Sequence, residues 1–307
     1  MPVKQFLKTF LLFSLMFASH EGFSSSESIE TLYKGQLIQE YAKLKKLKIK
    51  AQDRKIVYIV LAVLALALFF VLVYFFKLMG VFAAIIMIGT GYFILKSSAP
   101  VVGLYEKLFQ ENIISPITNQ TAGFVSSQPP LSEETLEVSH LFSPEIKQFS
   151  SWNLYQKEGI KFSYIHVAFD TKHDDSVERI AENIFDGYLI MIDMPNKLEG
   201  VLVSEKLRDK VAINDTTMRS FFSKGDKAGK QNGFDIYGSV SQENRDKVSP
   251  LHDKMVAVSY RNTMTYILLY KNTNPFSIDV FHDFDLLQAK KYEDAIVEIE
   301  SLIQIIK

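Results

Sequence analysis

The longest apolar run in the chain covers residues 56–76, where no charged residue interrupts 21 consecutive positions. Sixteen of these positions carry Leu, Ile, Val or Phe, and the others carry Ala or Tyr. As a helix the run is about 31 Å long, which matches the hydrocarbon core of a bilayer. A soluble helix of this length would keep polar residues on one face. The pattern therefore predicts a transmembrane helix over residues 56–76.

A second and weaker apolar run, residues 78–95, follows directly after Lys77. Gly80, Gly89 and Gly91 dilute it, and its 18 residues reach about 27 Å as a helix, just enough to span a bilayer. Beside a strong first helix, this run can satisfy its backbone as the return arm of a hairpin. We therefore expect residues 56–96 to form a two-helix transmembrane hairpin.

Basic residues gather ahead of the first apolar run, and only Asp53 opposes them. They are Lys43, Lys45, Lys46, Lys48, Lys50, Arg54 and Lys55. The turn between the runs has Lys77 alone, whereas Lys96 and Lys107 follow the second run. The positive-inside rule therefore places both flanks in the cytoplasm. The same cluster also suits attraction to anionic lipid, but its role in topology is the simpler interpretation.

The N-terminal segment, residues 1–26, contains a pattern that resembles a signal peptide. Lys4 and Lys8 precede a ten-residue apolar stretch, 9–18, but Met16 makes a poor cleavage site before Ala18. Cleavage would also move the basic cluster to the outer face, against the positive-inside rule. Three interpretations stay open: residues 1–18 are a cleaved signal peptide, the segment lies in the membrane interface, or Met16 is the true start.

Residues 27–55 contain no proline and repeat apolar residues at spacings of three and four, which predicts a basic amphipathic helix. The apolar positions are Ile29, Leu32, Tyr33, Leu37, Tyr41, Leu44 and Leu47. This stripe either packs on the soluble domain or pairs with another copy of the chain. The heptads are too few to decide between the two.

A connector, residues 97–134, is expected to hold a short helix over 104–114 and to be punctuated by Pro116 and by Pro129 and Pro130. From about residue 135 the pattern changes to short runs of alternating and β-branched residues. These runs predict an α+β domain over residues 135–307, built on a mainly antiparallel sheet.

Eight strands are expected in this domain: 152–157, 160–169, 188–193, 201–204, 234–240, 255–260, 264–270 and 276–280. The second of these is apolar on both faces, which is typical of a central strand. The three residues between 255–260 and 264–270 suit a hairpin. Short helices are expected over 143–149 and 177–184, and a long one begins at Asp285, with Gln288 placed to complete a capping box.

Charge is unevenly divided along the chain. Residues 1–99 carry 12 basic and 5 acidic residues, a balance of +7, whereas residues 100–307 carry 22 and 30, a balance of −8. An acidic domain argues against nucleic acid as a partner, because binding phosphates needs a basic face. The chain has no cysteine, which excludes disulfides, thiolate metal sites and cysteine nucleophiles.

Several short strings follow one another in a characteristic order. After the helix over 27–55 and the hairpin come Tyr105-Glu106-Lys107-Leu108-Phe109, Ser139-His140-Leu141-Phe142, Asp186-Gly187-Tyr188-Leu189 and a terminal helix after Asp283–Asp285. In this order the chain resembles the bacterial membrane-protein family called domain of unknown function 3137. That family tends to carry a more acidic segment near Tyr155–Gly159, which only Glu158 and Gly159 echo here. The resemblance implies a bacterial inner-membrane protein with a cytoplasmic domain, and it implies no activity.

Candidate chemistry is sparse. Asp170, His173 and Asp174, with Asp175, form a polar group that has the side chains of a catalytic or metal site, but a solvated turn after a strand is the ordinary explanation. His282, Asp283 and Asp285 form a similar group, in which Asp285 already has a capping role. Residues 224–233 miss the spacing of a phosphate-binding loop and are interpreted as a mobile basic loop. No cofactor and no metal ion are expected.

Together these patterns favour a membrane-anchored interaction or scaffolding protein without enzymatic activity. Its expected partners are the lipid bilayer and either an unidentified protein or a second copy bound through residues 27–55. The alternative is an enzyme acting at the membrane through Asp170, His173 and Asp174. The sequence leaves the biological process, the partner and the oligomeric state open.

Overall fold

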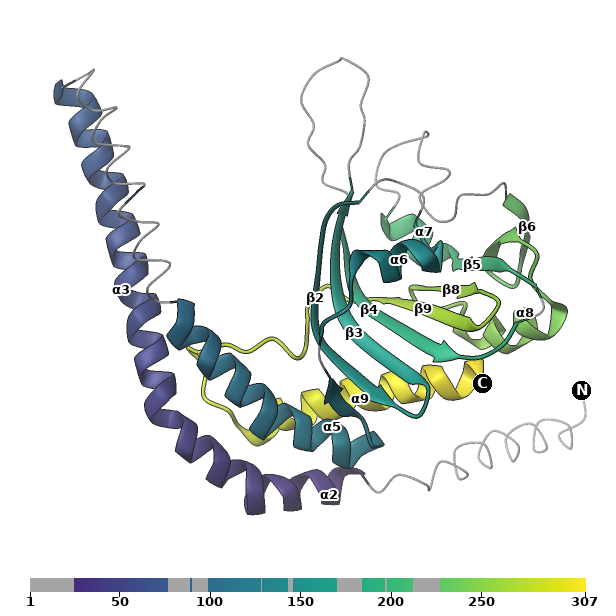
Figure 1. Ribbon diagram of the computed structural model, residues 1–307, viewed down its shortest axis with the longest axis horizontal. Coiled ribbons are helices and arrows are strands. Elements are labelled where there is room, and N and C mark those ends of the chain that lie inside the picture. The colour runs from purple at the N-terminus through teal and green to yellow at the C-terminus, as the bar shows by residue number, and fades with distance from the viewer. Residues whose placement is uncertain are drawn as a thin grey trace, which may run out of the picture. The chain divides into compact units, whose positions relative to one another are not determined.

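The computed structural model describes residues 25–76, 89, 99–127, 129–142, 146–169, 184–196, 198–211 and 227–307 (Figure 1). The chain divides into two compact units. The first consists of residues 1–117 and 278–293, and the second of residues 118–277 and 294–307. Each unit is described by itself.

The first unit is built on one continuous helical segment. It consists of α2 (Ser25–Leu32), a π-helical turn (Tyr33–Leu37) and α3 (Ile38–Phe76). The helix expected over 27–55 is confirmed, and it runs without a break into the apolar run. Ile29, Leu37, Leu44 and Ala51 are buried on one face. Ile29 and Leu37 are eight residues apart, whereas the later spacings are seven. The π-turn between Ile29 and Leu37 accommodates the extra residue, so Ile29 stays on the same face as the other three.

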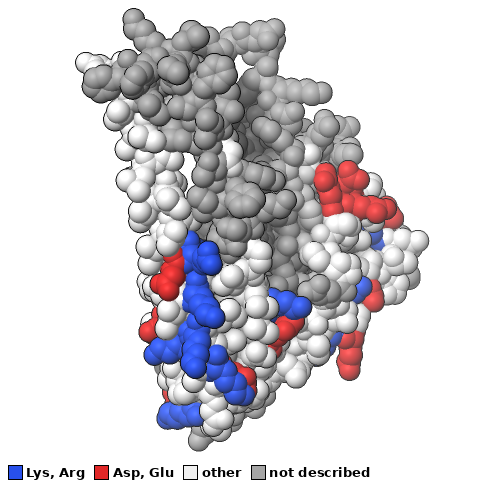
Figure 2. Space-filling view, turned by 60° about the vertical axis from the view of Figure 1, so that its left-hand side comes forward, with Lys and Arg blue, Asp and Glu red and all other residues white. Residues whose placement is uncertain are grey.

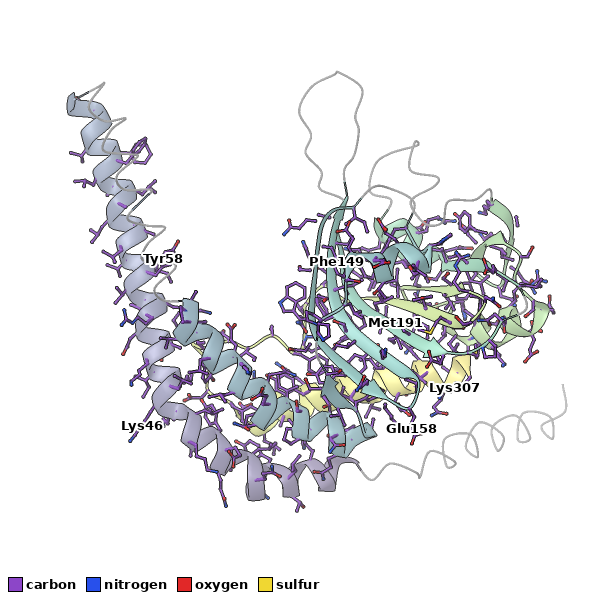
Figure 3. All side chains as sticks on the ribbon, viewed as in Figure 1. Lys46, Tyr58, Phe149, Glu158, Met191 and Lys307 are labelled. Atoms are coloured by element: carbon purple, nitrogen blue, oxygen red, sulfur yellow. The ribbon has the colours of Figure 1, made fainter. Side chains whose placement is uncertain are left out.

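The apolar part of α3 is long and apolar enough to cross a membrane, by length and composition. Most of its large side chains are exposed, and none of its most apolar stretch is buried, unlike the core helix of a soluble domain. Figure 2 shows a stripe of Lys and Arg that stops where the uncharged surface begins, and Figure 3 shows Lys46 and Tyr58 on either side of that boundary. The expected second span, 78–95, lies outside the described residues apart from Gly89, and so do residues 1–24.

A second helical segment of the first unit begins at residue 99. It is α-helical over 99–109, continues through a π-turn (Gln110–Ile114) and ends with α5 (Ser115–Ala122). The helix expected over 104–114 is confirmed, but the expectation that Pro116 interrupts the chain is wrong. The wider π-turn ahead of Pro116 shifts the carbonyl that the proline ring would otherwise meet, so the helix continues.

The second unit is a sheet of nine strands in the part of the chain that the structure describes. They are β1 (Val125–Ser127), β2 (Ile146–Lys157), β3 (Ile160–Phe169), β4 (Ile184–Asp193), β5 (Gly200–Ser204), β6 (Lys227–Gln231), β7 (Phe234–Gly238), β8 (Val256–Tyr260) and β9 (Met264–Tyr270). Their order is β1-β2-β3-β4-β9-β8-β5-β7-β6, and each neighbouring pair is antiparallel. The α+β class with a mainly antiparallel sheet is confirmed.

The pairing of the strands follows from their tight turns. Glu158 and Gly159, both with positive φ, join β2 to β3, as Asn232 and Gly233 join β6 to β7. Positive φ at both turn residues matches the right-handed twist of the flanking strands. The expected hairpin of β8 and β9 is confirmed, and β3 pairs on both sides, as expected of a central strand.

Helices cover both faces of the sheet (Figure 1). The short helices α6 (Glu133–Ser139) and α7 (Glu205–Val211) lie on one face, and α9 (Leu286–Ile306) lies on the other. A further helix, α8 (Gln242–Val248), precedes a short 3-10 turn (Ser249–Leu251).

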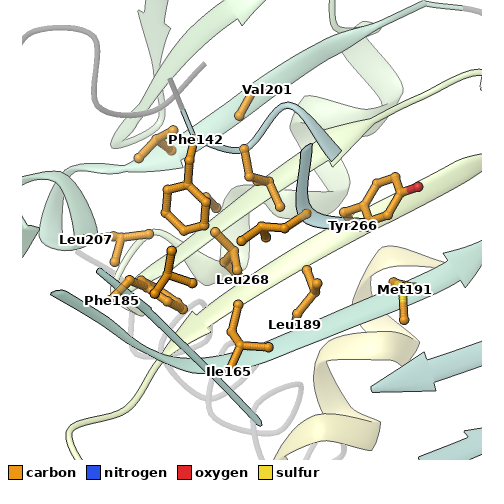
Figure 4. Close-up of a cluster of buried hydrophobic side chains, with 14 of the residues drawn as sticks. Phe142, Ile165, Phe185, Leu189, Met191, Val201, Leu207, Tyr266 and Leu268 are labelled. Atoms are coloured by element: carbon orange, nitrogen blue, oxygen red, sulfur yellow. The ribbon is translucent and has the colours of Figure 1, made fainter. Parts of the chain in front are cut away.

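The core on the side of α6 and α7 is aromatic and aliphatic (Figure 4). Phe142 meets Phe185 edge to face, with ring centroids 5.5 Å apart, and Leu189, Leu207 and Leu268 surround them. These side chains come from α7, from strands β4 and β9 and from the segment after α6. Strand alternation therefore places one face of the sheet in this cluster.

The N-terminus of α9 is capped by Asp285, as expected. Its carboxylate accepts a hydrogen bond of 2.8 Å from the backbone N–H of Gln288. The side-chain amide of Gln288 donates to Tyr292 Oη, 2.8 Å away, so Gln288 also links the first turn of α9 to the next one.

Several local expectations are wrong. Residues 146–149, expected to be helical, begin β2, because cross-strand pairing with β3 outweighs their local preference. The strand expected over 276–280 has no regular structure. The loop expected over 224–233 is largely strand β6 and its turn into β7. Of the helix expected over 177–184, residues 177–183 lie outside the described residues and Ile184 begins β4.

Tyr188 of β4 offers a test of this core, because its hydroxyl is buried and meets no hydrogen-bond partner among the described residues. Its ring lies against Tyr164 and Phe276, and burial raises its pKa. Tyr188→Phe removes an unsatisfied polar group, so we expect the free energy of unfolding to stay unchanged or to rise by about 1 kcal/mol. Urea unfolding of the full chain in detergent measures this.

Tyr164→Phe is the matched control for that prediction. The hydroxyl of Tyr164 donates to the carbonyl of Lys271 at 3.1 Å, so its removal is expected to cost about 1 kcal/mol. Equal losses for the two variants would contradict the interpretation that the Tyr188 hydroxyl is unsatisfied.

Candidate functional site

The two polar groups that the sequence singled out differ in whether the structure describes them. Asp170, His173 and Asp174 lie outside the described residues, between the end of β3 and the start of β4. His282, Asp283 and Asp285 are described, but each has a different partner. Within the described ranges, no group of three or more His, Asp or Glu side chains is placed to hold a metal ion.

Lys48 instead joins two distant segments of the first unit. It lies on α3 with its side chain buried, and it pairs with the carboxylate of Asp283. The hydroxyl of Tyr41 donates to the same carboxylate oxygen at 2.8 Å. Because an unpaired buried ammonium is costly, this contact ties α3 to the chain that leads into α9.

Electrostatics agree with this geometry. Hydrogen bonds from Lys48 and Tyr41 lower the pKa of Asp283. Burial works against the charged form of Lys48, but its hydrogen bonds to Asp283 and Tyr41 outweigh burial and raise the pKa of the ammonium. Both groups are therefore ionised at neutral pH. Lys48, expected at first only to set topology, also has a structural role.

Aromatic rings surround this ion pair. Phe284 lies 5.6 Å from Tyr33, 5.7 Å from Tyr41 and 5.6 Å from Phe109 between ring centroids. Phe284 also stacks on Tyr292 of α9 at 6.4 Å. The amphipathic stripe of residues 27–55 is thus covered by other segments of the first unit, namely residues 99–114 and 278–293.

The opposite face of α3 carries the basic surface, which we define as Lys45, Lys46, Lys50 and Arg54. All four side chains are exposed. Ile49 among them is also exposed. This surface lies next to the apolar part of α3, and Figure 2 shows its charge as one stripe. A basic stripe at the end of an apolar helix is the composition that anionic lipid headgroups attract.

In the second unit, His166 and Asp186 form a pair that no sequence pattern indicated. They stand opposite each other on β3 and β4, and His166 Nδ1 lies 2.8 Å from Asp186 Oδ1. The exposed ring of Trp152 lies 6.5 Å from the imidazole and 5.8 Å from Tyr164. The carboxylate fixes the orientation of the imidazole. Only the strand register brings these residues together, since they are 20 positions apart.

A second buried charge in this unit is Asp235 of β7. Arg208 of α7 donates to it at 2.8 Å, and Lys227 of β6 forms an ion pair with it. Burial opposes ionisation of this carboxyl, but the hydrogen bonds from Lys227 and Arg208 outweigh it and lower the pKa of Asp235. The cluster holds α7 against the hairpin of β6 and β7. The Asn232-Gly233 dipeptide is typical of a two-residue hairpin turn, so the sequence could have indicated this hairpin.

Comparison of the chain with protein-family models, with curated proteins and with solved structures finds no match. The resemblance to the domain of unknown function 3137 therefore stays a prediction.

Proposed function

We propose that the chain is a membrane-anchored protein whose α+β domain binds a partner next to the bilayer without acting as an enzyme. Residues 56–76 and 78–95 cross the bilayer as a hairpin, and the helix ahead of the hairpin and the domain behind it both lie in the cytoplasm. The membrane is the inner membrane of a bacterium.

The main support for the hairpin is that the chain returns to α3 after the two apolar runs. Phe109 packs edge to face on Tyr41, with centroids 6.4 Å apart, so residues 99–114 lie beside α3. Burial raises the pKa of Glu106, and Lys55 is close enough to oppose that shift. Residues 56–76 extend about 30 Å beyond Lys55. The 22 residues 77–98 must bring the chain back over this distance, and as a helix they would measure about 33 Å.

Charge supports the orientation. The basic surface lies directly ahead of the apolar part of α3, whereas the segment between the two expected spans carries only Lys77. The positive-inside rule therefore favours the cytoplasm for residues 38–55 and, through the hairpin, for residues 99–307.

Packing supports a role in interaction rather than in chemistry. The buried charges of the domain have structural partners: Asp235 has Arg208 and Lys227, and Glu300 has Lys157 at 3.6 Å. Self-association through residues 27–55 would have to use their exposed face, because Ile29, Leu37, Leu44 and Ala51 are buried within the unit. The alternative enzyme rests on Asp170, His173 and Asp174, which lie outside the described residues.

Reporter fusions after Lys307 test this topology. We expect a fused green fluorescent protein to be fluorescent and a fused alkaline phosphatase to be inactive, because the first works in the cytoplasm and the second outside it. Removal of residues 1–15 is expected to change neither result if these residues are not a signal peptide. An active phosphatase with the full chain would overturn the proposed orientation.

A further inference from the structure

The chain between the sheet and α9 forms a strap, residues 278–285, that lies along α3 in the first unit. Phe284 contacts Tyr33 and Tyr41, and Asp283 contacts Tyr41 and Lys48. From Phe284 back to Asp283, the contacts of the strap therefore move forward along the helical segment, from Tyr33 to Lys48. The strap therefore runs from α9 toward the apolar part of α3.

The tip of the strap, residues 279–282, is a tight turn. The backbone N–H of Phe281 donates to Asp279 Oδ1 at 2.8 Å, and His282 Nδ1 lies 2.5 Å from Asp279 Oδ2. Val280 is fully buried and anchors the turn, whereas Phe281 is 42% exposed and the His282 side chain is 80% exposed. The turn therefore leaves the large aromatic side chain of Phe281 partly exposed.

The tip continues from Lys48 in the direction of the apolar part of α3. Lys48, which holds Asp283, precedes Ile56 by eight residues, or about 12 Å of helix. Lys55 is also among the groups that lower the pKa of Asp279, after the Phe281 amide and His282, so the positive charge of Lys55 is felt at the tip.

We propose that the tip of the strap is a second membrane contact, in which Phe281 inserts into the headgroup region of the leaflet that α3 enters. This inference rests on the proposed function, because it requires α3 to cross the bilayer. The headgroup layer is about 5–7 Å thick on each side of the hydrocarbon core. Aromatic rings favour this layer, and Arg54 and Lys55, the last basic residues before the apolar run, match anionic lipid headgroups.

The ion pair of Lys48 and Asp283 has a role in this contact, because it holds the strap in place before the membrane is bound. A loop that carries an exposed aromatic residue gains from binding only if it is held in place beforehand, since ordering a loop costs conformational entropy. The buried ammonium of Lys48, the hydroxyl of Tyr41 and the ring cluster around Phe284 hold the strap against α3.

Single-tryptophan variants test the contact. Trp152 is the single tryptophan of the chain, so Trp152→Phe gives a silent background for Phe281→Trp in the full chain. The variant is reconstituted in vesicles of phosphatidylcholine and phosphatidylglycerol that carry bromine either near the start or near the middle of the acyl chains. We expect a blue-shifted emission that loses intensity, more strongly with bromine near the start of the chains.

Two matched positions separate the possible failures. Leu66→Trp, in the apolar part of α3, reports on the anchor, and Val138→Trp, at an exposed position of α6, reports on solvent. If Leu66→Trp is quenched but Phe281→Trp behaves like Val138→Trp, the strap contact is wrong and the anchor stands. If Leu66→Trp is not quenched, the proposed function itself fails. A blue shift of Phe281→Trp without quenching would mean burial against protein, a second copy included, and would also overturn the contact.

Discussion

Arginine at both Leu64 and Leu66 is expected to release the chain from membranes. The two side chains lie near the middle of residues 56–76 and are 59% and 60% exposed. Exchanging leucine for arginine at the centre of a span costs about 3–4 kcal/mol each, against about 5–10 kcal/mol gained by the whole run. Extraction with alkaline carbonate, followed by sedimentation, should move the chain from the pellet to the supernatant.

Ile49→Arg is the control for this variant. Ile49 is 48% exposed on the same helix but lies among the lysines ahead of the apolar run. An added arginine there strengthens the basic surface and should leave the chain in the carbonate pellet. If the double variant at Leu64 and Leu66 also stayed in the pellet, residues 56–76 would not be the anchor.

The helix of the first unit was predictable because its signals are local. Charge-free length predicts the apolar part, and spacings of three and four predict the amphipathic part. The π-turn at Tyr33–Leu37 was not predictable, because it depends on keeping Ile29 on the face that Leu37 and Leu44 occupy. The segments that cover the buried face of this helix could not be predicted either, because they lie more than 60 residues away in the sequence.

The sheet was predictable where a strand is apolar on both faces or where a turn is short. β3, β8 and β9 meet these conditions and were expected within a residue or two. β1 and β6 did not, because β1 has three residues and β6 is polar along its length. The strand expected over 276–280 failed because Phe276 and Val280 are buried by packing outside the ladder.

The candidate sites depended on long-range pairing and were therefore the least predictable. Lys48 is one of seven basic residues ahead of the apolar run, and nothing local distinguishes it from Lys46 or Lys50. Its partner Asp283 is 235 positions away. His166 needs the register of β3 and β4 to meet Asp186. Residue type indicated the chemistry available, but only the fold decides which charges meet.

Alanine at Gly187 is expected to have the largest effect on the stability of the domain. Gly187 of β4 pairs with Tyr270 of β9, and an added Cβ would lie 2.1 Å from the carbonyl oxygen of Leu269 and 3.0 Å from the Phe185 ring. The carbonyl belongs to a strand that β8 holds on its other side, so it cannot retreat. We expect a loss of about 3 kcal/mol or more in the free energy of unfolding, measured by urea unfolding of the full chain in detergent.

Gly229→Ala tests whether the loss comes from the close approach of strands rather than from the exchange itself. Gly229 also lies in a strand, β6, but an added Cβ would meet no atom within 4 Å. Its replacement should leave stability within about 0.5 kcal/mol. Because β4 and β9 join the two halves of the sheet, Gly187→Ala should also speed hydrogen exchange at that junction first. Equal stability of the two variants would mean that β4 and β9 do not approach as closely as the structure requires.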